Sequence, residues 1–305
     1  MNARPFRFGL QLSSADATGV VELARRAEAT GFDVVHTYDH VGPDAIPPLT
    51  PLAAIAVATG RIRLCPLVIN NDFHDPVLLA RDVVAIDHLS GGRMELGVGA
   101  GHSFTEYEAI GAAFDPAPVR KARLAESVEL LRRLFDGGAV THAGEHYRVD
   151  GVELGGAAQA RLPILVGVNG RAALAHAAEH ADVVGLTMLG RTLEDGQRHE
   201  TRWEADRLDA TIAHVRDAAR AAGTDPEVQV LVQQVVVTDD RDSVAGEMVT
   251  RGVVPTPEDA LATPFLAIGT HAEIAAHLHE CRERWGISYF SVRDLDAFAP
   301  VLSLL

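Results

Sequence analysis

The sequence predicts one domain of 305 residues, 1–305, folded as a (β/α)8 (TIM) barrel with insertions. Strand and helix patterns alternate four times within the first hundred residues, at a spacing that implies parallel strands joined by crossover helices. The whole chain contains eight strand-like stretches, which is the number that closes such a barrel. Composition does not shift along the chain as it would between two different domains. A doubly wound open sheet is therefore only the runner-up.

The expected strands are short apolar or alternating stretches, as is typical of strands buried in a parallel sheet. The first, FRFGLQL, alternates in the manner of an inner strand. Pro66 lies within the third, where proline removes a ladder donor and argues against a smooth strand. The eight stretches are residues 6–12, 33–37, 62–69, 93–98, 163–168, 182–187, 228–238 and 287–292.

The expected helices have apolar residues at helical spacing and recognisable ends. Gly31, for example, ends the first one. They cover residues 18–30, 52–59, 76–89, 118–135, 171–180, 201–222 and 271–285. Residues 137–149 are expected to form a small hairpin off the barrel. Residues 239–266 contain Gly, Pro and Thr, look the least regular, and are expected to be an insertion or a mobile loop.

Bulk composition limits the class of protein. The net charge of −15 argues against nucleic acid and anionic membrane as partners, because both need a basic surface. No apolar run approaches the ~20 residues that span a bilayer, and no signal peptide precedes the first strand. We therefore expect a cytoplasmic protein with reduced cysteines, Cys65 and Cys281. Lys121 is the only lysine, which indicates a GC-rich genome such as that of an actinobacterium.

The most informative stretch is residues 86–111, which reads as helix, strand, glycine-rich turn and helix. Three glycines recur at every second position: Gly97, Gly99 and Gly101. Because glycine has no Cβ, such a turn lets backbone approach a flat or anionic ligand, although the pattern alone is more often only a tight turn. It is not a dinucleotide fingerprint, because the G-x-G-x-x-G spacing is missing. Ser103 or Thr105 can cap the next helix, with Glu106 as a capping-box partner.

Side chains at the carboxyl ends of barrel strands are the candidates for chemistry. Asp39 and His40 follow the second strand. A histidine there can exchange a proton near neutral pH, and an adjacent aspartate can fix its tautomer or merely cap the loop. His36 and His40 could also suggest a metal, but strand residues four apart lie about 13 Å apart, so no metal is expected.

The turn after the fifth strand, Gly167-Val168-Asn169-Gly170-Arg171, opens a helix. Successive N–H groups, the positive end of the helix and a guanidinium together suit a phosphate. The alternative is that Asn169 only caps the helix and Gly170 only eases the turn.

The stretch LSGGRMELGVGAG, followed by EYEAIG, resembles the luciferase-like flavin and deazaflavin monooxygenase family. Within it, the resemblance is to actinobacterial oxidoreductases that use coenzyme F420, an 8-hydroxy-5-deazaflavin. It runs from residue 6 to about residue 186 and resumes from about residue 268. The resemblance implies a (β/α)8 barrel with an insertion, and a hydride transfer between C5 of the deazaflavin and an organic substrate.

The resemblance assigns roles to the candidate residues. It places His40 at the reactive C5 edge as proton donor, oriented by Asp39, with His102 as the second choice. Sugar-phosphate dehydrogenases of the family carry a glutamate where this chain has His102. They also carry a tryptophan in the loop corresponding to residues 41–48, which has none here. We therefore do not expect a sugar phosphate as the substrate.

The resemblance also implies the cofactor-binding set. A β-bulge with a non-prolyl cis peptide at Leu67–Val68 would back the ring, and Asn70 would line the pocket. The ribityl chain and the phosphate would lie beside two turns, composed of Gly99, Ala100 and Gly101 and of Gly167, Val168, Asn169, Gly170 and Arg171. The anionic tail of coenzyme F420 would need arginines, and the nearest candidates in sequence are Arg171, Arg191 and Arg198.

Three other functions stay open, and the third of them is a metal-dependent hydrolase, which the spacing of His36 and His40 argues against. One is an FMN-dependent monooxygenase that receives reduced flavin from a separate reductase and uses O2, since FMN also presents a ring, a ribityl chain and a phosphate. Another is a flavin-binding protein without turnover. Closeness to the deazaflavin enzymes favours coenzyme F420. A small-molecule substrate and a homodimer are expected, and residues 189–198 and 239–266, where the resemblance fades, would decide the substrate.

Overall fold

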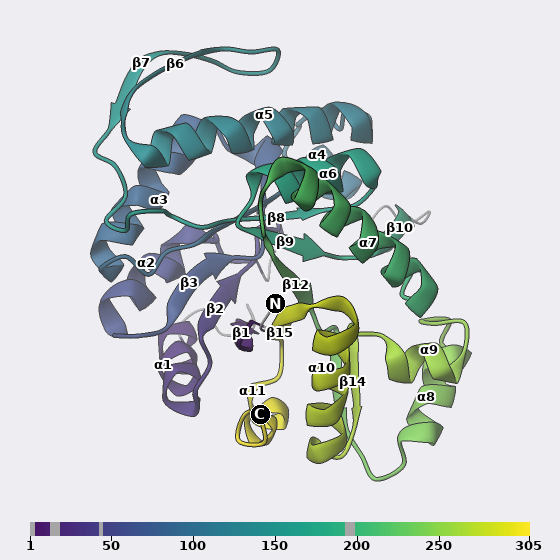
Figure 1. Ribbon diagram of the computed structural model, residues 1–305. Helices are drawn as coiled ribbons and strands as arrows, with labels where there is room; N and C mark the ends of the chain where they lie inside the picture. The colour runs from purple at the N-terminus through teal and green to yellow at the C-terminus, as the bar shows by residue number, and fades with distance from the viewer. Residues whose placement is uncertain (1–3, 13–18, 43–44, 193–198) are drawn as a thin grey trace.

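The structure is a computed structural model that describes residues 4–12, 19–42, 45–192 and 199–305. Within these residues a ring of parallel strands is wrapped by helices (Figure 1). The ring is closed by the parallel bridge between Leu64 and Met94. Its strands are β1 (Arg7–Gln11), β2 (Val34–Thr37), β3 (Arg63–Pro66) with its continuation β4 (Ile69–Asn70), β5 (Leu96–Gly99), β8 (Ile164–Val168), β9 (Val183–Leu186), β12 (Glu227–Leu231) and β15 (Ile287–Val292). The predicted (β/α)8 barrel is confirmed.

The seven predicted helices around the ring begin and end within four residues of the predicted bounds, whereas the helix at residues 295–302 was not predicted. Thr270 begins α10 with a capping box to Glu273, and Asp75 caps α3. The helices are α1 (Val20–Thr30), α2 (Leu49–Ala58), α3 (Pro76–Ser90), α5 (Ala117–Asp136), α6 (Arg171–His180), α7 (Ala205–Ala222), α10 (His271–Trp285) and α11 (Leu295–Leu302).

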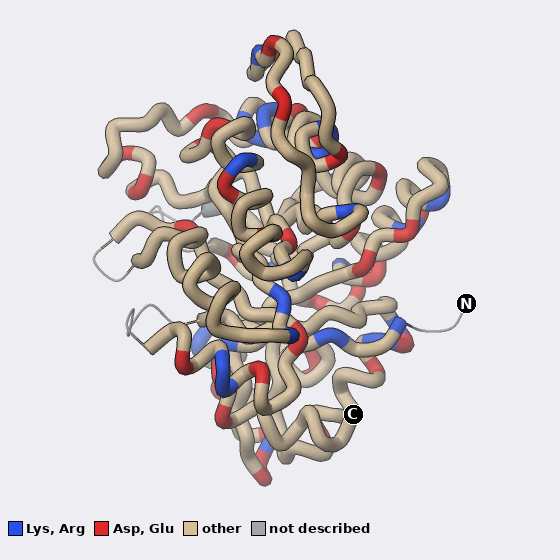
Figure 2. The backbone as a smooth tube through the Cα atoms, turned by 90° about the vertical axis from the view of Figure 1, so that its left-hand side faces the viewer, with Lys and Arg blue, Asp and Glu red and all other residues tan. Residues whose placement is uncertain are grey.

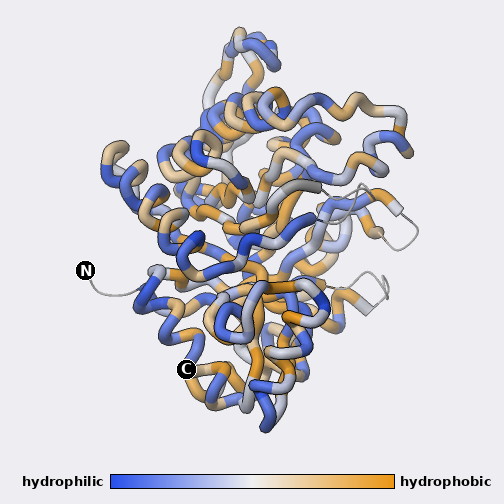
Figure 3. Tube along the Cα trace, turned by 90° about the vertical axis from the view of Figure 1, so that its right-hand side faces the viewer, coloured by the Kyte–Doolittle hydropathy of each residue, from blue (hydrophilic) through white to orange (hydrophobic). Residues whose placement is uncertain are grey.

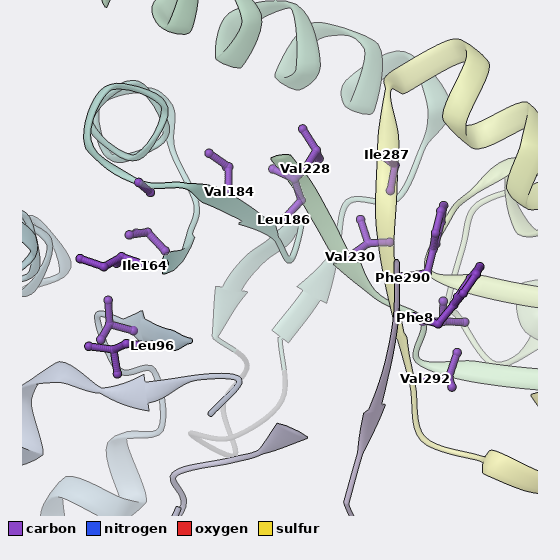
Figure 4. Close-up of a cluster of buried hydrophobic side chains, with 14 of the residues drawn as sticks. Phe8, Leu96, Ile164, Val184, Leu186, Val228, Val230, Ile287, Phe290 and Val292 are labelled. Carbon is purple, nitrogen blue, oxygen red and sulfur yellow. The ribbon is translucent and has the colours of Figure 1, made fainter. Parts of the chain in front are cut away.

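The main hydrophobic core lies between the ring and the helices. Outward-facing strand residues such as Phe8, Leu96, Ile164 and Phe290 are buried there (Figure 4). Hydrophobic segments accordingly run through the middle of the molecule (Figure 3). Because each fully buried side chain of this size stabilises the fold by about 1.5–3 kcal/mol, this layer is the main source of stability.

The interior of the barrel is polar at one end. Glu95 is 1% exposed and accepts hydrogen bonds from Arg63 and, at 2.5 Å, from Arg7. The second amino group of Arg7 donates to Glu227 at 2.7 Å, and its guanidinium lies 4.3 Å from the ring centre of Tyr289. Each buried charge therefore has a partner of opposite sign, as burial requires.

His36 belongs to this interior. Its Nδ1 lies 3.0 Å from the carbonyl oxygen of Cys65, and its Nε2 lies 2.9 Å from the hydroxyl of Ser291. Burial lowers the pKa of His36 to about 4, so the ring is neutral at pH 7. His36 is thus a hydrogen-bonded core histidine and does not share a site with His40.

The glycines of β5 make room for a backbone irregularity in the neighbouring strand. The Leu67–Val68 peptide is cis and separates β3 from β4, as predicted. A Cβ at Gly97 would lie 2.1 Å from the carbonyl oxygen of Pro66, and one at Gly99 would lie 2.7 Å from Cγ2 of Val68. The alternating glycines therefore serve the protein's own packing as well as any ligand.

Two expectations about the last third of the chain are wrong. The seventh strand does not run to residue 238, because the chain leaves the barrel after β12 and β13 (Gln234–Val237) pairs in parallel with β14 (Leu266–Gly269). Residues 239–266 are not irregular, since they contain α8 (Arg241–Thr250) and α9 (Pro257–Ala262) (Figure 1). Asp240 and Thr256 cap these helices with their side chains, a signal that the sequence held.

Two hairpins complete the described chain. The expected hairpin after α5 is present and longer than predicted, with β6 (Gly138–Ala143) paired to β7 (Arg148–Leu154). A second hairpin, β10 (Leu189–Thr192) with β11 (His199–Thr201), follows β9. Acidic and basic residues are interspersed over the chain (Figure 2). Among the described helices, none combines the length and the apolar character that a membrane crossing requires.

The role of Gly97 in packing can be tested by substitution. We expect Gly97→Ala to lower the free energy of unfolding by about 3 kcal/mol, because the new methyl group overlaps the Pro66 carbonyl. Gly155→Ala is the matched control, since no atom lies within 4 Å of a Cβ there. Urea unfolding of both variants measures the difference, and equal midpoints would contradict the packing argument.

Candidate functional site

His40 lies at the carboxyl end of β2 and pairs with a carboxylate from another element. Its Nδ1 is 2.7 Å from Oε1 of Glu106, which lies on α4 (Phe104–Ala109). The side chain of His40 is 39% exposed and that of Glu106 is 16% exposed. A carboxylate holds the proton on Nδ1, which leaves Nε2 as the nitrogen that can exchange a proton with a substrate.

The prediction that Asp39 orients His40 is wrong. The carboxylate of Asp39 accepts hydrogen bonds from the backbone N–H of Asn70, at 2.9 Å, and from Nε2 of His74, at 2.8 Å. Successive side chains in an extended segment point in opposite directions, so Asp39 and His40 diverge. Asp39 instead ties the end of β2 to the end of β4, and its membership of the site stays a prediction.

The expected capping box of α4 is also absent. Ser103 occupies the N-cap without a side-chain hydrogen bond to the helix, and Glu106 pairs with His40 instead. The helix is held from its other face by Tyr107, which donates to Oδ1 of Asn70 and to Oδ2 of Asp72, both at 3.0 Å. Asn70, which is 7% exposed, therefore acts mainly by positioning α4.

His102 approaches His40 from the turn after β5. The two ring centres are 5.5 Å apart with their planes nearly perpendicular, and His199 of β11 lies 5.1 Å beyond. His102 is exposed as a residue, but the protein atoms around its ring displace water from it and lower its pKa to about 4, with further lowering by His40, His199 and Arg120. A ring that is neutral at pH 7 can hydrogen-bond a substrate but does not carry an imidazolium proton, which weakens its prediction as a proton donor.

Leu67 and Val68 form an apolar platform at the same end of the barrel. Both are partly buried against the interior cluster that includes Val34, Leu165 and Tyr289. Cβ atoms at Gly99 and Gly167 would contact the methyl groups of Val68, so these glycines let its side chain sit low in the barrel. The surface that remains exposed suits the face of a flat ring.

The turn between β8 and α6 keeps the features of an anion site. Gly170 is the N-cap of α6 with φ of 88°, and it brings no side chain to the first turn. The alternative that Asn169 caps this helix is therefore wrong. A cavity of about 310 Å³ adjoins the turn, and its basic lining residues are Arg171, Arg202, Arg207 and His214. Of the arginines predicted for an anionic tail, Arg198 lies outside the described residues, as does the side chain of Arg191.

Comparison with known proteins identifies the family of the chain. A family model described as luciferase-like monooxygenase matches residues 3–257. The chain belongs to the luciferase-like monooxygenase family. The F420-dependent glucose-6-phosphate dehydrogenase of Nakamurella multipartita is 34% identical over 192 residues, which are 60% of this chain and 56% of that protein. The chain spans about half the length of the curated relatives that it matches first.

Two solved structures share the fold of this luciferase-like chain. One is an F420-dependent secondary alcohol dehydrogenase in complex with an F420–acetone adduct, with a TM-score of 0.79 at 18% identity, covering 99% of this chain and 98% of that one. The other is a monooxygenase from Streptomyces bottropensis, with a TM-score of 0.74 at 24% identity, covering 98% and 97%.

Sequence reasoning missed the role of two basic residues near the start of α5 in this luciferase-like barrel. Arg120, which is 7% exposed, donates to the carbonyl oxygens of Ala100, at 3.0 Å, and Gly101. The next residue, Lys121, donates to the carbonyl oxygen of Asn169 at 2.7 Å. Two adjacent residues of α5 thus bind the two glycine-rich segments, 99–101 and 167–171. A single lysine in a chain that otherwise uses arginine was the signal available in the sequence.

The neutral state of His102 gives a direct test. We expect its ring protons to titrate with a midpoint near pH 4 in an NMR experiment, because burial and neighbouring cationic groups disfavour the imidazolium. His102→Asn assigns the resonance by removing it. Replacing His40 with asparagine should raise the midpoint, since His40 contributes to the lowering. An ordinary midpoint of about 6.5 in the wild-type protein would contradict the lowered pKa of His102.

Proposed function

We propose that this protein is a coenzyme F420-dependent oxidoreductase that transfers a hydride between C5 of the deazaflavin and an organic substrate. The observation that carries the proposal is the convergence of three features at one end of the barrel. They are the apolar platform Leu67–Val68, the anion turn 167–171 and the His40–Glu106 pair. Names of similar proteins support it, since one curated relative and one solved structure are called F420-dependent.

Residues of this chain would bind and orient the cofactor. The platform would pack against one face of the ring, and the N–H groups at the start of α6, with Arg171, would bind the phosphate. Arg202 and Arg207 in the adjoining cavity can offset part of the −15 net charge, which otherwise disfavours an anionic tail. Coenzyme F420, when bound, gives or takes the hydride at C5, so the protein contributes mainly position.

His40 would move the proton that accompanies the hydride. With Nδ1 held by Glu106, its Nε2 accepts a proton from a substrate hydroxyl, or returns one to a carbonyl in the reverse direction. Glu106 is a positioning residue in this account, because it acts through His40. His102, neutral at pH 7, would hydrogen-bond the substrate oxygen from the other side.

The substrate differs from glucose 6-phosphate in our proposal. His102 stands where the resemblance leads to a glutamate, and residues 41–48 contain no tryptophan. The described lining near His40 combines imidazoles, His102 and His199, with the Leu67–Val68 platform. Such a set of side chains fits a small alcohol or carbonyl compound better than a doubly charged phosphate ester.

The second candidate is an FMN-dependent monooxygenase that uses O2. The family model carries the monooxygenase name, and one solved structure of the same fold is a monooxygenase. The anion turn does not distinguish the two cofactors, because both carry a phosphate at the end of a ribityl chain. A homodimer and a separate reductase as cofactor supplier stay predictions.

Titration with both cofactors separates these candidates. We expect coenzyme F420 to bind more tightly than FMN, with an affinity that falls as salt rises, because charges are screened beyond about 8 Å at physiological ionic strength. Arg171→Ala should weaken binding about tenfold, since a charge-assisted contact to phosphate is lost. Arg220→Ala is the control, because this arginine is 76% exposed and pairs with Asp217 outside the cavity. Tight FMN binding without F420 binding at low salt would promote the monooxygenase.

The proton-transfer pair is tested by kinetics with reduced or oxidised coenzyme F420 and a panel of alcohols and carbonyl compounds. His40→Ala should lower kcat by about a hundredfold with little change in cofactor affinity. Glu106→Gln should lower kcat by about tenfold while KM changes little, because the imidazole loses its orientation. Glu108→Gln, an exposed neighbour on α4, should leave both constants unchanged. Full activity of His40→Ala would show that His40 is structural.

A further inference from the structure

A group of metal-ligating side chains lies away from the barrel mouth, between α5 and α6. His176 and His180 are four residues apart on α6, and Glu129 faces them from α5. One potential ligand atom from each lies within 4.8 Å of the others. In the part of the chain that the structure describes, this is the one group of three or more histidine, cysteine or acidic side chains with this spacing.

The helix places both imidazoles on one face. Residues i and i+4 are neighbours on a helix surface, and the two ring centres are 4.3 Å apart with their planes inclined by 32°. Nε2 of His176 lies 3.2 Å from Oε1 of Glu129, so the carboxylate already points at the pair. Glu179, whose Oε1 is 3.7 Å from Nε2 of His180, offers a second carboxylate nearby.

We propose that Glu129, His176 and His180 bind one divalent transition-metal ion as a clasp between α5 and α6. Two imidazole nitrogens and one carboxylate oxygen are the ligands that Zn²⁺, Ni²⁺ and Cu²⁺ accept, whereas Mg²⁺ and Ca²⁺ prefer oxygen alone. Ligand atoms about 2.1 Å from one ion in tetrahedral geometry lie about 3.4 Å apart. Small rotations of these partly exposed side chains bring them to that spacing, and water completes the coordination.

The position of the clasp links it to the anion turn. Lys121 lies eight residues before Glu129 on α5 and donates to Asn169, while α6 begins at Arg171, five residues before His176. Since a helix rises about 1.5 Å per residue, the clasp lies roughly 8–12 Å from the turn along the two helices. Metal binding would therefore fix the position of α6, which begins at the anion turn, relative to α5, whose Lys121 donates to that turn. Any effect on cofactor binding rests on the proposed function, but metal binding and stability do not.

The experiment uses the full chain after dialysis against a chelator, without cofactor. Calorimetric titration with ZnCl2 should show one saturable site per chain, and zinc should raise the Tm, since it binds the folded state. His176→Ala and His180→Ala should each weaken zinc binding by at least about tenfold. His142→Ala is the control, because His142 also pairs with a glutamate, Glu126 at 2.8 Å, but does not belong to a group of three potential ligands among the described residues.

Two results would overturn the proposal. One is the absence of saturable zinc binding by the wild-type chain at millimolar zinc. The other is unchanged binding by the double variant His176→Ala/His180→Ala, which would place the ion elsewhere. If the double variant fails to fold, Glu129→Gln keeps the test open, because it removes one ligand charge from the surface of α5. If the wild-type chain binds zinc but does not bind coenzyme F420, the result would count against the proposed function alone.

Discussion

The contact between Val68 and the glycines of the neighbouring strands is the constraint on which the barrel mouth depends. Gly97 and Gly99 leave no side chain where the Pro66 carbonyl and the methyl groups of Val68 lie, and Gly167 does the same from β8. Strand three can therefore break between β3 and β4 without opening the ring. Leu67 and Val68 at the break pack against the interior cluster, and Asn70 just after it accepts the hydrogen bond from Tyr107 that holds the helix α4. The platform and the His40–Glu106 pair thus share one structural origin.

Charged side chains outside this contact hold the glycine-rich turns and the strand ends in place. Arg120 and Lys121 donate to backbone carbonyls of the two glycine-rich turns, so the first turn of α5 fixes the distance between them. Asp39 connects the ends of β2 and β4 through Asn70 and His74. These side chains act on protein atoms, whereas His40, His102 and Arg171 are the residues that we propose for the ligand. Rigid support of this kind matters because catalysis by a hydride-transfer cofactor depends on position within fractions of an ångström.

The sequence predicted the regular part of the fold well, because buried strands and amphipathic helices carry periodic signals. It predicted α10, β15 and the cis peptide at Leu67–Val68, the last through the family resemblance. It failed where a contact joins residues far apart in the chain. Glu106 has the spacing of a capping-box residue, yet its carboxylate pairs with His40, 66 positions away. Adjacency suggested Asp39 as the partner, although neighbouring side chains in an extended segment diverge. The composition of 239–266 also concealed two capped helices.

The central claim is that the Leu67–Val68 platform and the 167–171 turn hold one tricyclic cofactor with its reactive edge at His40. A crystal structure of the protein with bound coenzyme F420 tests it most directly. The account predicts electron density for the ring against Leu67 and Val68, the phosphate at the N-terminus of α6 beside Arg171, and C5 within reach of Nε2 of His40. Density for the ring away from the platform, or with C5 directed away from His40, would contradict the account.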